Sequence, residues 1–162
     1  MKKTQKLAVL AMLTAAAMTL SFVESLIPPL AAVPGVKIGL ANIAVIFTLY
    51  HFGAKEAAAV SLVRLALISL LFGNAASFLY GLAGAALSLT LMIILKRFTP
   101  LSHVGVSVAG GVAHNVGQIA VACFVLGTEK ILYYLPFLVL SGTLAGIAVG
   151  VVSGIIAKRL EK

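Results

Sequence analysis

Aspartate is absent from this sequence, and its four acidic residues are all glutamates. Paired carboxylates that could hold magnesium or carry out general acid–base catalysis are therefore missing. The chain has no Gly-x-x-x-x-Gly-Lys-Ser/Thr segment, so it does not bind ATP through a P-loop. Its single cysteine, Cys123, lies in an apolar run and excludes a disulfide framework or a cysteine metal site. We therefore expect no enzyme activity, no catalytic residues, no metal site and no cofactor.

Charged residues are also scarce, at 10% of the chain, whereas hydrophobic residues make up 62%. Average soluble domains are about 45–50% apolar and about 25% charged. The composition predicts an all-α integral membrane protein, with residues 1–162 forming a single transmembrane domain in the cytoplasmic membrane. The net charge of +8 could suggest nucleic acid. The basic residues flank apolar runs instead, which is typical of membrane proteins. We therefore expect membrane lipid, and no nucleic acid, as a partner.

Breaks in the apolar runs predict a six-transmembrane-helix bundle. One helix from Ala57 to Leu95 would be about twice as long as the membrane core is thick, so Gly73-Asn74 is expected to divide it. The N-terminal stretch resembles a signal peptide, but its apolar run continues without a cleavage site, which favours a retained helix. The predicted helices span about residues 7–24, 38–52, 57–72, 75–95, 104–126 and 132–157.

The basic residues predict that both termini are cytoplasmic. Nine of them fall on the inner side in this topology, Lys37 and Lys130 fall outside, and Arg64 lies within the third helix. The second helix is short, so a re-entrant segment is the alternative. That alternative would place Lys96, Arg97 and the basic C-terminal residues outside, against the positive-inside rule.

Polar groups in the fifth and third helices are candidates for a ligand site. Ser107, Gly111, His114, Asn115 and Gln118 gather on one side of a helix. Polar residues at this depth often mark a site, although hydrogen bonds that merely join helices are the alternative. Arg64 has no acidic residue within reach along its own helix. It is expected to contact either Glu24 across the bundle or an anionic group of a substrate.

Residues Pro34 to Asn42 form the one polar break between two long apolar runs near the N-terminus. Pro34 and Gly35 interrupt the backbone, and Lys37 and Asn42 follow at the mouth of the second helix. We expect this stretch to form the outer rim of a substrate pocket. Asn74, near the start of the fourth helix, is a further candidate for this rim.

Two stripes of small residues predict close helix packing. Ala11 and Ala15 lie four apart on the first helix, where a helix of this chain or of a partner could approach. Gly142, Gly146, Gly150 and Gly154 form a second stripe on the sixth helix. This stripe favours static packing, with a face that slides during transport as the alternative.

Three segments resemble the Gx transporter family, whose members are often labelled heptaprenyl diphosphate synthase component I. They are Pro34-Gly-Val-Lys-Ile-Gly-Leu-Ala-Asn42, Phe72-Gly73 and Ser107-Val-Ala-Gly-Gly-Val-Ala-His-Asn-Val-Gly-Gln118. More distantly, the entry to the second helix and the Ala11-x-x-x-Ala15 stripe are similar to S components of energy-coupling factor transporters. That resemblance implies six helices that bind a vitamin or metal near the outer face, and an alanine stripe that docks on a coupling subunit driven by two ATPases.

These observations predict a small-molecule-binding subunit of an importer. Its substrate would be a vitamin-like or anionic compound, with flavin as the leading candidate, and it would bind Lys37, Asn42, Arg64, Asn74, His114, Asn115 and Gln118. A transmembrane coupling subunit and ATPases are the expected partners, with Ala11 and Ala15 at the interface. The alternatives are a membrane accessory protein of polyprenyl diphosphate or quinone synthesis and a purely structural subunit of a redox complex.

Overall fold

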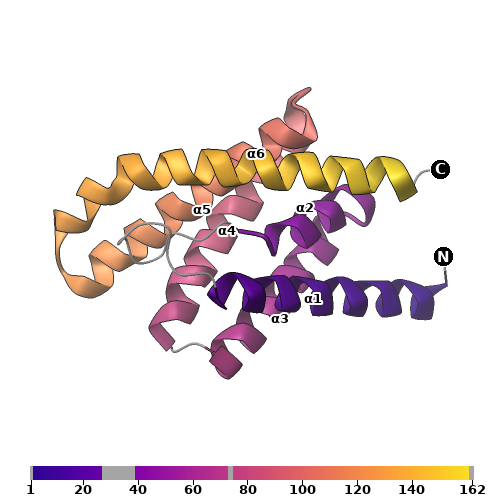
Figure 1. Cartoon of the computed structure of the whole chain (residues 1–162), viewed down its shortest axis with the longest axis horizontal. Helices are drawn as coiled ribbons and strands as arrows, with labels where there is room; N and C mark the ends of the chain where they lie inside the picture. Colours follow the sequence, from indigo (N-terminus) through magenta and orange to yellow (C-terminus); the bar gives the residue numbers. More distant parts are fainter. Residues whose placement is uncertain (1, 27–38, 73–74, 161–162) are drawn as a thin grey trace.

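Helices account for all regular secondary structure in the residues that the computed structural model describes, which are 2–26, 39–72 and 75–160 (Figure 1). This confirms the predicted all-α class. The elements in chain order are α1 (Lys3–Leu26), α2 (Asn42–His51), α3 (Ala54–Phe72), α4 (Ala75–Phe98), α5 (His103–Leu126), the 3-10 helix η1 (Glu129–Tyr134) and α6 (Leu135–Leu160).

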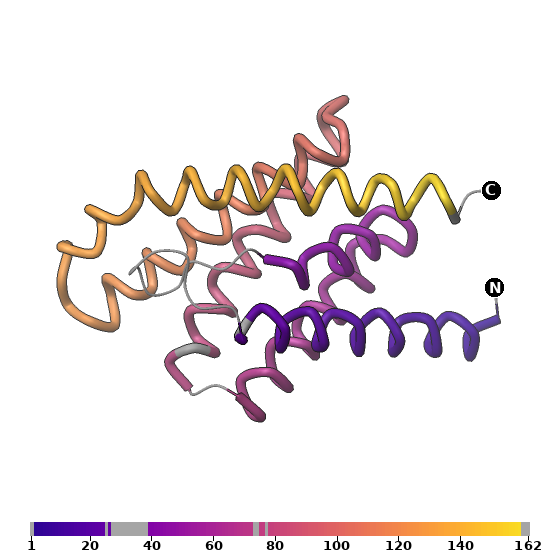
Figure 2. The backbone as a smooth tube through the Cα atoms, viewed as in Figure 1, coloured from indigo at the N-terminus to yellow at the C-terminus, as the bar shows by residue number. Residues whose placement is uncertain are grey.

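The helices pack around α2 and α5. Helix α5 has its most extensive contacts with α4 on one side and α6 on the other, whereas α1 packs against α3 and α2. Figure 2 shows that α1 and α6 run in roughly opposite directions, so that the two chain ends lie at the same end of the molecule. The space enclosed between the α1, α2 and α3 group and the α4, α5 and α6 group holds the candidate site.

Helix α2 forms the centre of the bundle. Its residues 44–49 are all buried, and Val45, Ile46 and Leu49 belong to the main hydrophobic cluster with Met92 of α4 and Val149 of α6. A helix that is apolar on every side is typical of a core position. At 10 residues, α2 is shorter than the predicted 38–52.

The later start of α2 has a local cause. Gly39 has φ +77, a left-handed conformation that glycine adopts without steric cost. The carbonyl oxygen of Gly39 then accepts a hydrogen bond from the backbone N–H of Asn42 at 2.9 Å, and the helix begins at that residue. Ile38, the predicted first residue, lies outside the described residues.

The sixth α-helix begins later than the sequence predicts. The α-helix begins at Leu135 rather than near Leu132, and η1 occupies the preceding residues. Pro136 explains the difference, because its ring would clash with the carbonyl of Leu132 in a continuous α-helix. The proline therefore lies in the first turn of α6, where a helix tolerates it.

Glycines bring α5 and α6 into direct backbone contact. A Cβ atom placed on Gly146 would lie 2.6 Å from the Cα of Val108, and one on Gly150 would lie 2.7 Å from the Cα of Val104. Gly154 differs, since its nearest neighbour, the Cβ of His103, would be 4.0 Å away. The stripe therefore packs closely on α5 at Gly146 and Gly150 and loosens toward the C-terminus.

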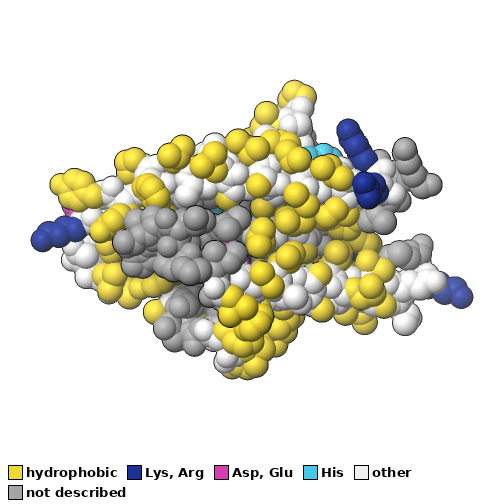
Figure 3. All heavy atoms as spheres, viewed as in Figure 1, with side chains coloured by type: hydrophobic (Ala, Val, Ile, Leu, Met, Phe, Trp, Pro, Cys, Tyr) yellow, Lys and Arg dark blue, Asp and Glu magenta, His cyan; other side chains and the backbone are white. Residues whose placement is uncertain are grey.

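The outer surface fits a multi-pass membrane protein. Large apolar side chains are exposed on the helices, for example Leu70 at 82% and Phe124 at 88%. On the face in Figure 3, Lys and Arg side chains lie only at the two ends of the long axis, with hydrophobic side chains between them. Within the described ranges, four helical segments are long and apolar enough to cross a membrane, namely Lys3–Glu24, Phe78–Phe98, His103–Leu126 and Glu129–Arg159. Helix α2 is short and apolar, and α3 carries Lys55, Glu56 and Arg64.

Candidate functional site

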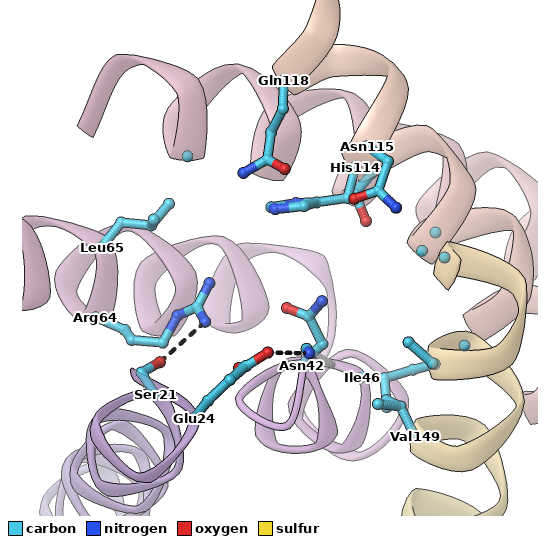
Figure 4. Close-up of a pocket in the computed structure, with 18 of the residues that line it drawn as sticks. Ser21, Glu24, Asn42, Ile46, Arg64, Leu65, His114, Asn115, Gln118 and Val149 are labelled. Atoms are coloured by element: carbon cyan, nitrogen blue, oxygen red, sulfur yellow. Dashed lines mark hydrogen bonds between the residues drawn. The ribbon is translucent and has the colours of Figure 1, made fainter. Parts of the chain in front are cut away.

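A cavity of about 190 Å³ lies inside the bundle, and all six α-helices contribute to its wall. Figure 4 shows two sets of polar side chains facing each other across it. Ser21, Glu24, Asn42 and Arg64 lie on the side formed by α1, α2 and α3. The opposite side belongs to α5. Apolar residues of several helices, including Ile46, Leu65 and Val149, fill the remaining wall.

Arg64 is the buried cation of this cavity, with only 8% of its surface exposed. Its Nη1 donates to Ser21 Oγ at 3.4 Å, a long hydrogen bond. Its Nε is buried and has no acceptor among the described residues. A buried group that lacks a hydrogen-bond partner is energetically costly. Arg64 is therefore equipped to receive an acceptor from a molecule in the cavity.

Glu24 lies next to Arg64 in Figure 4 and is buried at 9% exposure. Its Oε1 accepts the backbone N–H of Gly39 at 2.5 Å, which joins the end of α1 to the turn before α2. An electrostatic attraction acts between Glu24 and Arg64. The two side chains form no ion pair, since the described residues contain a single one, between Lys6 and Glu56.

The α5 side of the cavity presents His114, Asn115 and Gln118. The ring of His114 and the amide of Gln118 point toward the space between the helices in Figure 4. Asn115 is also engaged in the fold, because its Nδ2 donates to the carbonyl oxygen of Leu138 on α6 at 2.6 Å. The sequence left two roles open for these residues, a ligand site and hydrogen bonds that join helices. The structure contains features of both, because Asn115 joins two helices and all three residues line the cavity.

The structure brings together five of the residues expected to bind substrate, namely Asn42, Arg64, His114, Asn115 and Gln118. Lys37 and Asn74, expected at the rim, lie outside the described residues. Ala11 and Ala15 are exposed on α1, so no described helix of this chain covers them.

Other residues of the cavity were not anticipated from the sequence. Ser21 and Ser88 line it, and Glu24, which had been considered only as a partner of Arg64, lines it as well. The spacing offers a signal in hindsight. Ser21 and Glu24 are three apart on α1, and Gly81 and Ser88 are seven apart on α4, so that each pair shares a helix face.

Comparisons with known proteins give one match to a family and one to a solved structure. No curated protein is significantly similar to the chain. The solved structure is the S component of a bacterial energy-coupling factor transporter, with a TM-score of 0.70 and 18% identity over 99% of this chain and 97% of that chain. This likeness shows a shared fold. The family described as heptaprenyl diphosphate synthase component I matches residues 13–156. Because the match spans most of the sequence, the chain belongs to this family, as its motifs predicted.

Proposed function

We propose that this protein is the substrate-binding membrane subunit of an importer. The observation that carries the proposal is the central cavity, in which the buried Arg64 lacks an acceptor for its Nε among the described residues. Ionisable residues within membrane proteins are rare and commonly mark substrate pathways. The fold shared with an S component supports the same function.

The proposed topology has six membrane spans with both termini cytoplasmic. Its support is that the two chain ends lie at the same end of the molecule (Figure 1), and that this topology would place nine of the twelve basic residues on the inner side, as the positive-inside rule expects. In this orientation, Gly39 and Asn42, which line the cavity, would lie on its outer side. Substrate would enter from that side.

The cavity favours a compact vitamin-like or anionic substrate. Its volume of about 190 Å³ lies below the roughly 300–1,000 Å³ of pockets that hold drug-sized ligands. A flavin, with three fused rings and a polyol chain, would need the cavity to widen. We therefore favour a smaller compound, whose acidic group would accept hydrogen bonds from Arg64 and whose polar groups would reach His114 and Gln118.

Uptake would be driven by ATPases through a transmembrane coupling subunit, with the exposed face of α1 at the interface. Ala11 and Ala15 would let a partner helix approach closely. Ala11→Leu should abolish co-purification with a coupling subunit, because the larger side chain holds the helices apart. Ala86→Leu makes the same change at an exposed position of α4 and should have no effect. Assembly retained by Ala11→Leu would refute this interface.

The test of the main proposal is to identify the compound that co-purifies with the protein by mass spectrometry and to measure its uptake in cells. Arg64→Gln should abolish binding and uptake, because it removes the buried cation. Arg97→Gln makes the same chemical change at an exposed position and should preserve both. If Arg64→Gln still binds the compound and leaves its uptake unchanged, the pocket has no such role.

The description of the family favours one second function, a membrane accessory role in polyprenyl diphosphate synthesis. We assign no catalysis to this chain, since it contains no aspartate, and synthases of the usual type hold magnesium diphosphate through aspartate-rich motifs. A prenyl diphosphate among the co-purified compounds would support the accessory role, whereas a vitamin-like compound would support transport.

A further inference from the structure

Two opposite charges line the same cavity without forming an ion pair. Arg64 is 8% exposed and Glu24 is 9% exposed, and both border the open space in Figure 4. Buried charges are stabilised when they are paired and hydrogen-bonded. The attraction between these two residues supplies part of that stabilisation. The two side chains form no ion pair, so direct contact between them does not complete the stabilisation of the two charges.

Among the described residues, each of the two side chains keeps hydrogen-bonding capacity that no partner uses. The Nε of Arg64 has no acceptor among the described residues, and a guanidinium group can donate two parallel hydrogen bonds to one carboxylate. An ionised carboxylate accepts hydrogen bonds at about four lone-pair sites, and the described residues supply Glu24 with the N–H of Gly39. The cavity thus offers a donor site for an anionic group beside an acceptor site for a cationic group.

The balance of charge decides which ligands fit this arrangement. If a ligand carrying only negative charge bound to Arg64, its charge and that of Glu24 would be opposed by a single buried cation. A molecule with one negative and one positive group would leave the site neutral, with charges of alternating sign.

We propose that the cavity binds a compact zwitterion that carries both an acidic group and a protonated amine, as an amino acid does. The acidic group would contact Arg64, the amine would contact Glu24, and an apolar body would lie against Ile46, Leu65 and Val149. The volume of about 190 Å³ exceeds the roughly 150 Å³ of a cavity that holds benzene, so a single ring or branched chain fits. This inference rests on the proposed function and narrows its substrate class.

The experiment uses the full-length protein in lipid nanodiscs, incubated with the total small-molecule extract of its host cells. Retained compounds are then identified and quantified by mass spectrometry. We expect a zwitterion whose occupancy falls by about tenfold or more in both Arg64→Gln and Glu24→Gln, since a hydrogen bond to a charged group is lost in each. Arg97→Gln, an exposed change of the same kind, should retain it. Glu24→Asp and Arg64→Lys preserve the charges and should recover part of the occupancy in a protein of normal elution volume.

The outcomes separate this inference from the function on which it rests. A retained anion without a cationic group, bound as well or better by Glu24→Gln, would overturn the zwitterion and leave a substrate-binding subunit in place. The inference would also be overturned, with the proposed function left in place, if a zwitterion is retained and Glu24→Gln does not lower its occupancy. If no compound is retained by the wild-type protein, both the inference and the proposed function fail.

Discussion

Lys96 of α4 reaches the end of α2, where its Nζ donates to the carbonyl oxygen of Leu49 at 2.6 Å. The same ammonium group lies over the ring of Tyr50, 4.6 Å from its centroid. Because the last carbonyl groups of a helix lack partners within it, a cation at this end satisfies one of them and complements the helix dipole. In the sequence Lys96 indicates only membrane topology, whereas in the structure it also fixes the core helix to α4.

Lys96→Met should therefore destabilise the protein. We expect the free energy of unfolding to fall by about 1–2 kcal/mol, because the carbonyl of Leu49 loses a charged donor. Arg97→Met, at the next position and exposed, should change it by less than about 0.5 kcal/mol. Unfolding by detergent or heat in micelles measures both variants. If both variants lose the same free energy of unfolding, the effect comes from removing a positive charge at this end of the molecule and not from the contact of Lys96 with Leu49.

Gly146→Ala should weaken the contact between α5 and α6. The added Cβ would lie 2.6 Å from a backbone atom, the Cα of Val108, so one of the two helices has to shift. We expect a loss of about 1–3 kcal/mol, as for overpacked cores. Gly154→Ala is the matched control, because the nearest atom to its added Cβ, the Cβ of His103, would be 4.0 Å away. A thermal unfolding series should place the Gly154 variant near the wild type, and comparable losses would contradict close packing at Gly146.

Variants of Asn115 and Gln118 should differ in their effects on stability and on ligand binding. Asn115→Ala removes the hydrogen bond to the carbonyl of Leu138 and should lower the free energy of unfolding by about 1 kcal/mol. That carbonyl retains the hydroxyl of Ser141 as a donor, so the loss is modest. Gln118→Ala should leave stability unchanged and reduce ligand occupancy. The paired measurement is unfolding without ligand and binding with it. The prediction fails if the Gln118 variant unfolds as easily as the Asn115 variant.

The ion pair between α1 and α3 should make stability depend on pH. Lys6 Nζ donates a hydrogen bond to Glu56 and holds the pKa of that carboxyl below its ordinary value, and a backbone hydrogen bond adds to the effect. Because the folded-state pKa is the lower one, the pair stabilises the folded state above the unfolded-state pKa. That contribution is lost as the pH falls through the folded-state pKa.

The measurement is the difference in melting temperature between the wild type and Lys6→Met across pH. The difference should be largest near neutral pH, should begin to shrink near the ordinary glutamate pKa of about 4.3, and should vanish once the pH has fallen through the lower folded-state pKa. Lys55→Met removes the neighbouring exposed lysine and should show a much smaller change with pH. A difference that stays constant into acid would mean that Lys6 acts through packing rather than through Glu56.

Much of the fold could be predicted from the sequence because membrane solvation leaves few choices. Apolar runs of sufficient length have to become helices, and Gly127 and Ser102 are ordinary helix end signals. Gly127 adopts φ +60 after α5, and Ser102 Oγ accepts the N–H of Gly105 at its start. The helical periodicity of α5 likewise placed His114, Asn115 and Gln118 on one face, and the structure has them line one cavity.

The rest depends on contacts between segments far apart in the chain, which periodicity does not encode. The sequence offered Glu24 as one of two possible partners of Arg64. It did not indicate that Glu24 would accept the N–H of Gly39, or that the Nε of Arg64 would have no acceptor among the described residues. The spacing of the serines in α1 and α4 is only a weak signal of a site, because serine hydroxyl groups also occur on helix faces that merely pack. The bounds of α2 and α6 depended on a glycine dihedral and on one proline ring, which are local steric effects.

The shortness of α2 has a consequence for how the protein is made. Ten residues give a helix about 15 Å long, half the thickness of the hydrocarbon core. Such a helix leaves unpaired backbone groups at both ends, and lipid cannot satisfy them. We expect α2 to enter the bilayer only with its neighbours, after α3 and the later helices have been inserted. Biogenesis would then include a late step in which the core of the protein is the last part to leave water.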